Sequence, residues 1–111
     1  MRHDNVTLDD KYLLENGRAF ITGVQALIRV MLDRRRLDLR DGLNTAGFVS
    51  GYRGSPLGGL DQQANRAGKL LKSHEIVFKE GLNEDLAATA VWGSQQANLF
   101  PGAKFDGVSA M

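Results

Sequence analysis

Two stretches of this chain are candidates for a ligand-binding site. The first is a glycine-dense run, Gly51-Tyr52-Arg53-Gly54-Ser55-Pro56-Leu57-Gly58-Gly59. Because glycine lacks a Cβ atom, such a run lets the backbone approach a ligand closely. The second is Asn83-Glu84-Asp85, which has the residues of a helix start with Asn83 as the N-cap. A glutamate there also has a purely structural explanation, because it stabilises the helix dipole by about 0.3 to 1 kcal/mol.

The glycine-dense run matches no known phosphate-binding motif. It lacks the Lys-Ser or Lys-Thr of a Walker loop and the Gly-x-Gly-x-x-Gly spacing of a dinucleotide fold. Ser55 followed by Pro56 has the pattern of an N-cap and a first helical residue. A tight strand-to-helix turn without any ligand explains the run as well as a binding role does.

No metal site is predicted in this chain. The two histidines, His3 and His74, have no second histidine at ligand spacing, so neither is predicted to bind a metal or to catalyse a reaction. With no cysteine, the chain has no disulfide, thiolate zinc site or iron–sulfur cluster of its own.

Hydrophobic periodicity predicts the elements that place these residues. An apolar stripe predicts a helix from Arg18 to about Arg36, and the Arg34-Arg35-Arg36 triplet is interpreted as its solvated end. Short apolar runs predict three strands, at residues 44–50, 76–78 and 105–111. Two more helices are predicted, one marked by residues 60–71 and one running from about residue 84 to 97. In the last helix Ala90, Gly93 and Ala97 form a face of small side chains, and Trp92 is expected in a core or an interface.

Alternating helices and strands predict an α/β fold with a partial parallel sheet flanked by helices. Ligands of such sheets collect at the carboxyl ends of the strands. The glycine-dense run follows one strand and Glu84 follows the next, so the two converge if these strands are neighbours. We expect residues 1–11 to be a mobile leader and residues 12–111 to be part of a truncated domain, because only about three strands are present.

Composition narrows the classes of partner. The net charge of +1 over 111 residues gives no field that would attract nucleic acid or an anionic membrane. No apolar run of about 18 residues is present, and the N-terminus is too polar for a secretory signal. The predicted location is the cytoplasm.

Several stretches, taken together and in order, resemble a known family from about Val6 to Met111. They are residues 12–20, 42–48, 51–62 with Ser-Pro-Leu-Gly-Gly-Leu-Asp, and 83–96 with Asn-Glu-Asp-Leu-Ala-Ala-Thr-Ala-Val-Trp-Gly-Ser-Gln-Gln. The chain resembles the start of the indolepyruvate ferredoxin oxidoreductases in their long, fused form. These belong to the thiamine diphosphate dependent 2-oxoacid:ferredoxin oxidoreductases. The resemblance implies the start of a thiamine diphosphate pyrimidine-binding domain.

The resemblance implies a role for each candidate residue. Glu84 matches the catalytic glutamate that hydrogen-bonds a ring nitrogen of the cofactor's aminopyrimidine. In the glycine-dense run, the residues that the resemblance implies to be cofactor-binding are Gly51, Tyr52, Gly54, Ser55 and Pro56. Ser55 also offers a hydroxyl to the substrate. Arg53 offers a bidentate partner for a 2-oxoacid carboxylate if its side chain points inward, and outward is an equal alternative. Arg53 and Ser55 differ from the residues of two-subunit relatives.

The resemblance also implies partners that this chain does not contain. The implied cofactor is thiamine diphosphate, and the magnesium and iron–sulfur clusters that go with it would be held by other parts of the enzyme, so the chain alone is expected to be inactive. The implied reaction decarboxylates aryl pyruvates such as indolepyruvate, passing electrons to ferredoxin and the acyl group to coenzyme A. The remaining domains of the enzyme and a homo-oligomer are the other implied partners. The alternative is a non-catalytic remnant, or a small α/β module that binds a nucleotide or anion through the glycine-dense run.

Overall fold

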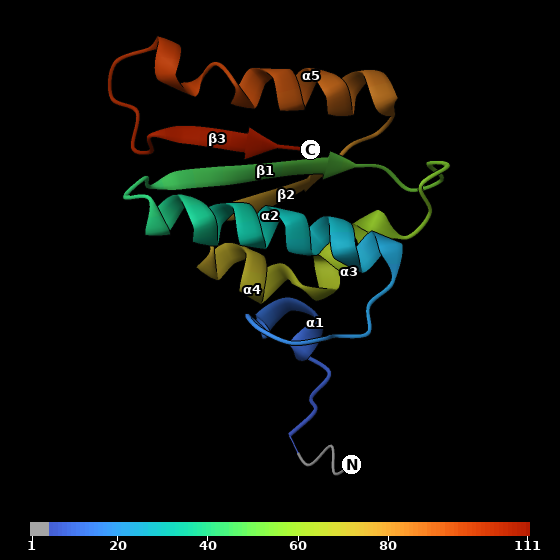
Figure 1. Ribbon diagram of the computed structural model, residues 1–111. Coiled ribbons are helices and arrows are strands. Elements are labelled where there is room, and N and C mark those ends of the chain that lie inside the picture. The colour runs from blue at the N-terminus through green and yellow to red at the C-terminus, as the bar shows by residue number, and fades with distance from the viewer. Residues whose placement is uncertain (1–4) are drawn as a thin grey trace.

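The computed structural model describes residues 5–111 and has a three-stranded parallel sheet with helices on both faces (Figure 1). The predicted α/β fold class is therefore confirmed. The strands lie in the order β2-β1-β3, so β1 pairs with both of the others. The elements are α1 (Asp10–Leu13), α2 (Gly23–Arg40), β1 (Thr45–Gly51), α3 (Leu60–Arg66), α4 (Gly68–Ser73), β2 (Ile76–Glu80), α5 (Glu84–Ser94), the 3-10 helix η1 (Ala97–Leu99) and β3 (Gly107–Ala110).

Helices fill both crossover connections, as parallel strands require. The chain passes from β1 to β2 through α3 and α4, and from β2 to β3 through α5 and η1. Figure 1 shows α2, α3 and α4 on one face of the sheet, and α5 followed by a short helical turn on the other. The sheet therefore brings the carboxyl ends of β1 and β2 side by side.

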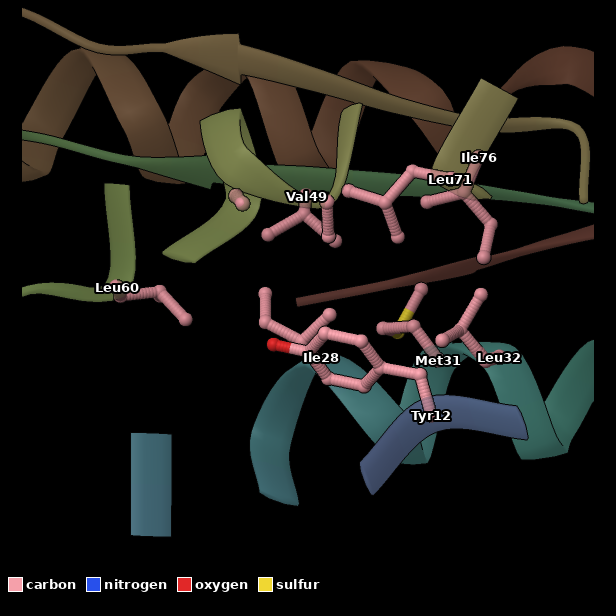
Figure 2. Packing of buried hydrophobic residues seen from close by; sticks show 10 residues of the cluster. Tyr12, Ile28, Met31, Leu32, Val49, Leu60, Leu71 and Ile76 are labelled. Carbon is pink, nitrogen blue, oxygen red and sulfur yellow. The ribbon is translucent and has the colours of Figure 1, made fainter. Parts of the chain in front are cut away.

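The main core lies between the sheet and the helices α2, α3 and α4 that cover one of its faces (Figure 2). Ile28, Met31 and Leu32, all on the predicted apolar stripe of α2, are at most 4% exposed. They meet Val49 of β1 and Ile76 of β2 in one cluster. The opposite face is covered more thinly, because Ala87 is the buried residue of α5.

The predicted bounds of the long helix were wrong at both ends. Thr22 caps α2 through a capping box, in which its side chain accepts from the Gln25 backbone N–H and the Gln25 side chain accepts from the Thr22 N–H. This reciprocal pair starts the helix five residues after Arg18. The helix continues to Arg40 and ends in a Schellman motif, with Gly42 at φ +80° and the Leu43 N–H donating to the Asp38 carbonyl.

The arginine triplet is therefore inside α2 and not at a solvated helix end. Arg34 pairs with Asp38, and Arg36 Nη1 lies 2.9 Å from Asp33 Oδ1. Arg35 reaches across to the start of β1, where it donates to Asn44 Oδ1 at 2.7 Å and to the Thr45 carbonyl. The triplet therefore pairs with acidic side chains of α2 itself and hydrogen-bonds the start of β1.

Helix α1 begins before residue 12 and joins the core through Tyr12. Asp10 and Lys11, assigned to the leader by sequence, lie in α1. Arg29 of α2 donates to the backbone carbonyls of Asp10, Lys11 and Leu14, in and just after this short helix. Tyr12 of α1 is 6% exposed and packs in the main core (Figure 2).

The last predicted helix is shorter than expected. It ends at Ser94, and Ala97 lies in η1, so the predicted face of small side chains is not continuous. A Cβ atom added to Gly93 would meet nothing within 4 Å, so this glycine faces open space. Trp92 is 67% exposed, which rules out a place in the core of this chain. Its expected role in an interface stays a prediction.

Candidate functional site

The two candidate stretches meet at the carboxyl ends of β1 and β2. These strands are parallel neighbours in register from Gly47↔Ile76 to Gly51↔Glu80, and the Gly81 N–H donates to the Gly51 carbonyl at 2.8 Å just beyond β2. The condition for convergence is thus satisfied. The Tyr52 hydroxyl, directly after β1, donates to Glu84 Oε1 at 2.8 Å. Sequence reasoning singled out both residues but did not foresee this contact.

A tight turn places Tyr52 at the strand end. The Ser55 N–H donates to the Tyr52 carbonyl at 3.3 Å, and Gly54 has φ +89°, which is the geometry of a turn that needs glycine at its third position. Gly51, assigned to the loop by sequence, is the last residue of β1. Gly54 therefore serves the turn, whether or not a ligand approaches it.

The predicted capping role of Ser55 and Pro56 was wrong. Helix α3 begins at Leu60, and its N-cap position is occupied by Gly59 with φ +88°. Ser55 Oγ instead accepts from the Leu57 N–H at 3.3 Å, a local serine turn that competes with helix formation. Ser55 is half-buried and Pro56 is exposed.

The start of α5 places Glu84. The Asn83 side chain accepts from the Leu86 N–H at 2.9 Å, which confirms the predicted N-cap. Glu84 and Asp85 occupy the first turn, where both carboxylates interact favourably with the positive end of the helix dipole. Gly81 permits the close approach of β2 to α5, because a Cβ atom there would lie 3.0 Å from the Ala87 Cβ and 3.4 Å from Ser50 Oγ.

Electrostatics at this site centre on the tyrosine. The hydrogen bond to Glu84 is the largest of the effects that raise the pKa of Tyr52, followed by burial and the Glu84 charge, while the Ser55 hydroxyl acts in the opposite direction. Tyr52 therefore stays protonated and remains a donor at neutral pH. Glu84 is exposed, and its Oε2 atom has no donor among the hydrogen bonds of residues 5–111.

The remaining site residues are placed less tightly. Arg53 is exposed, and within the described part of the chain it makes no hydrogen bond or ion pair. His74 follows α4, and its Nδ1 lies 2.9 Å from the Leu70 carbonyl oxygen. His3 lies outside the described residues. Within those residues no group of three or more histidine, cysteine or acidic side chains is arranged to hold a metal ion.

Asp38 is a buried charge that sequence reasoning missed. It is 2% exposed, and it accepts hydrogen bonds from Arg34 and, at 2.6 Å, from Thr45 Oγ1. These two hydrogen bonds hold the pKa of Asp38 below its ordinary value. The carboxylate joins the end of α2 to the start of β1, so its role is structural. An Arg-x-x-x-Asp spacing within a helix was the available signal.

A cleft of about 610 Å³ lies away from the strand ends, between α1, α3 and α4. Lys11, Arg66 and Lys69 line it together with the side chains of Gln25 and Gln63. Tyr12 also lines it, but the Tyr12 hydroxyl is buried and has no hydrogen-bond partner among residues 5–111. The cleft shares no residue with the strand-end site.

No family model, curated protein or solved structure matches this chain. None of the helices in residues 5–111 is long and apolar enough to cross a membrane.

Proposed function

We propose that this chain forms part of the pyrimidine-binding domain of a thiamine diphosphate dependent 2-oxoacid:ferredoxin oxidoreductase acting on aryl pyruvates such as indolepyruvate. The resemblance of its sequence motifs suggests the family. The observation that supports it best is the meeting of Tyr52 and Glu84 at the carboxyl edge of a parallel sheet, where such folds bind ligands. Ferredoxin, coenzyme A, a homo-oligomeric enzyme and a cytoplasmic location belong to the same proposal.

The residues at the strand ends fit an aminopyrimidine. Glu84 has one oxygen engaged by Tyr52 and one without a donor from the described residues, so it can accept a hydrogen bond from a ring nitrogen that carries a proton, as in the imino tautomer. When bound, thiamine diphosphate supplies the carbanion chemistry that decarboxylates a 2-oxoacid. The diphosphate and magnesium ligands belong, on this proposal, to other parts of the enzyme.

The proposed work of Glu84 is to hold and return a proton at its carboxylate. A carboxylate does this efficiently when water is excluded, because the proton then moves between two fixed groups. Glu84 is exposed in this chain, so the proposal requires a further protein surface to cover it. Tyr52 remains on the opposite side of the carboxylate as a donor. Arg53, exposed beside the turn, is the proposed partner for the substrate carboxylate.

The strand-end geometry disfavours the alternative of an anion-binding module. A phosphate or other anion held by the loop would lie near the Glu84 carboxylate, which hydrogen-bonds the loop residue Tyr52 at 2.8 Å. Like charges that lie close together repel each other, so any anion at this loop, the 2-oxoacid carboxylate included, needs a cation such as Arg53 beside it. A ligand that donates hydrogen bonds, such as an aminopyrimidine, suits this carboxylate better.

The test is Glu84→Gln in the complete enzyme that contains this chain. The variant keeps the size of the side chain but removes its acid–base function, so turnover at saturating thiamine diphosphate is expected to fall by about 10²-fold or more. Stability is expected to change by at most about 1 kcal/mol, the size of a charge–dipole interaction at a helix start.

Asp85→Asn is the matched control, because Asp85 lies in the same helical turn and also loses a charge. It is expected to keep parental turnover and a similar melting temperature. Near-parental turnover of Glu84→Gln would overturn the proposed function and leave Glu84 with its structural role alone.

A further inference from the structure

Tyr52 and Glu84 come from different elements that are each anchored by backbone hydrogen bonds. Beneath them, the Gly81 N–H donates to the Gly51 carbonyl at 2.8 Å and so joins the end of β1 to the segment before α5. The Tyr52 carbonyl closes the turn with Ser55, and the Asn83 cap fixes the first turn of α5. The two Cα positions are therefore set by the fold before their side chains meet.

A glutamate in the first turn of a helix, with no partner, would sample several rotamers in water. Fixing such a side chain costs conformational free energy, because the long, flexible chain loses rotamer freedom. The 2.8 Å hydrogen bond from the half-buried Tyr52 hydroxyl offsets part of that loss. It also occupies one of the two equivalent carboxylate oxygens, Oε1, and leaves Oε2 without a donor from the described residues.

We propose that Tyr52 is a positioning residue that fixes the Glu84 carboxylate with Oε2 available, so that Glu84 is arranged for its partner before the cofactor binds. The inference rests on the proposed function for its catalytic consequence. It goes beyond that function by giving Tyr52 a task that acts through Glu84, in place of a direct contact with the cofactor. Preorganisation of this kind places a reacting group without reordering it at each turnover.

The first experiment tests the contact itself and needs no cofactor. The chain has two tyrosines, so NMR of ring-labelled tyrosine gives two signals, which Tyr52→Phe assigns. The pKa of Tyr52 is raised mainly by the hydrogen bond to Glu84, whereas that of Tyr12 is raised by burial. Glu84→Gln is therefore expected to move the Tyr52 titration midpoint down toward the ordinary value of about 10, and to leave the Tyr12 midpoint in place.

Asp85→Asn is the control for a general change of charge in the same turn. It is expected to leave the Tyr52 midpoint within the error of the titration. A Tyr52 midpoint that is the same in the parent and in Glu84→Gln would mean that the contact is absent in solution, and the inference would fail.

The second experiment is a double-mutant cycle on turnover in the complete enzyme. Tyr52→Phe removes only the hydroxyl, and kcat is expected to fall by about 10-fold, the lower end of the range for a lost hydrogen bond to a charged group. Because Tyr52 acts through Glu84, adding Tyr52→Phe to Glu84→Gln is expected to cost little more. The KM for thiamine diphosphate is expected to change less than kcat.

The outcomes separate the two proposals. Fully additive losses in the cycle, or an unchanged kcat in Tyr52→Phe, would overturn the positioning role while Glu84 kept its own. Near-parental turnover in Glu84→Gln would overturn the proposed function, and the titration would still report whether Tyr52 holds the carboxylate.

Discussion

Gly47 is the residue at which the smallest possible substitution is expected to disturb the fold most. It lies in the centre of β1, directly opposite Ile76 of β2, and its own N–H donates to the Glu75 carbonyl at 2.9 Å. A Cβ atom there would lie 2.8 Å from Ile76 Cγ1 and 3.1 Å from Met31 Cε. Carbon atoms pack best at about 3.5 to 4.0 Å, so Ile76 must move by roughly 0.7 Å or more.

The neighbours have little room for this movement, because Ile76 and Met31 are each only 4% exposed. Overpacking of a filled core typically costs about 1 to 3 kcal/mol. Alanine also lowers the entropy of the unfolded chain, which returns about 0.4 to 1 kcal/mol. The net effect of the two ranges is at most about 2.6 kcal/mol, and from their middle values Gly47→Ala is expected to lower the free energy of unfolding by about 1 to 2 kcal/mol, or roughly 4 to 16 °C in Tm for a domain of this size.

Urea titration followed by circular dichroism measures this change, with Gly93→Ala as the matched control. Gly93 lies inside α5, and a Cβ atom there would meet nothing within 4 Å. The control is expected to be more stable than the parent by up to about 1 kcal/mol, because alanine favours helix more than glycine does. If Gly47→Ala matched the parent or gained stability as Gly93→Ala does, the close packing of β1 on Ile76 and Met31 would be refuted.

Three further substitutions test other contacts. The pKa of Asp38 is lowered in the folded chain, so its ionised carboxylate stabilises the fold above about pH 4, and this stabilisation is lost as the pH falls through the folded-state pKa. Asp38→Asn is therefore expected to be less stable than the parent at pH 7 and to lack this acid-dependent loss. Urea midpoints measured across pH check both expectations. Tyr12→Phe removes a buried hydroxyl that has no partner among residues 5–111, so its free energy of unfolding is expected to equal or exceed the parent's, by up to about 1 to 3 kcal/mol in thermal unfolding; a clear loss would reveal a partner for the hydroxyl. Asn83→Ala removes the cap of α5 and is expected to cost about 1 kcal/mol in thermal unfolding, whereas an unchanged Tm would show that the cap contributes nothing.

The sequence alone determined the elements whose signals are local. The apolar stripe identified the core face of α2 through Ile28, Met31 and Leu32, because residues three and four apart share one side of any helix. Asn83 was identified as a cap because an amide side chain serves the free N–H groups of a helix start wherever the helix lies. The α/β class followed from the alternation of such elements.

Boundaries failed where several local signals compete. Ser55-Pro56 has the pattern of a helix start, yet the chain makes two further turns and enters α3 through Gly59. The Thr22 capping box and the Gly42 motif moved both ends of α2 away from the range that hydrophobic periodicity suggested. Each outcome depends on which of two nearby caps gives the better set of hydrogen bonds, and composition does not decide that.

Only the tertiary structure decided how the site is assembled. Tyr52 and Glu84 are 32 positions apart in the chain, and nothing in their sequence neighbours fixes the distance between their side chains. The contact exists because β1 and β2 are adjacent and parallel, which brings the turn after one strand beside the helix after the other. Asp38 was missed because the sequence does not show that its side chain is buried where the end of α2 meets Thr45 of β1. Strand order is a property of the whole packed chain, because it is set by the faces that helices must cover and by the connections that reach between them.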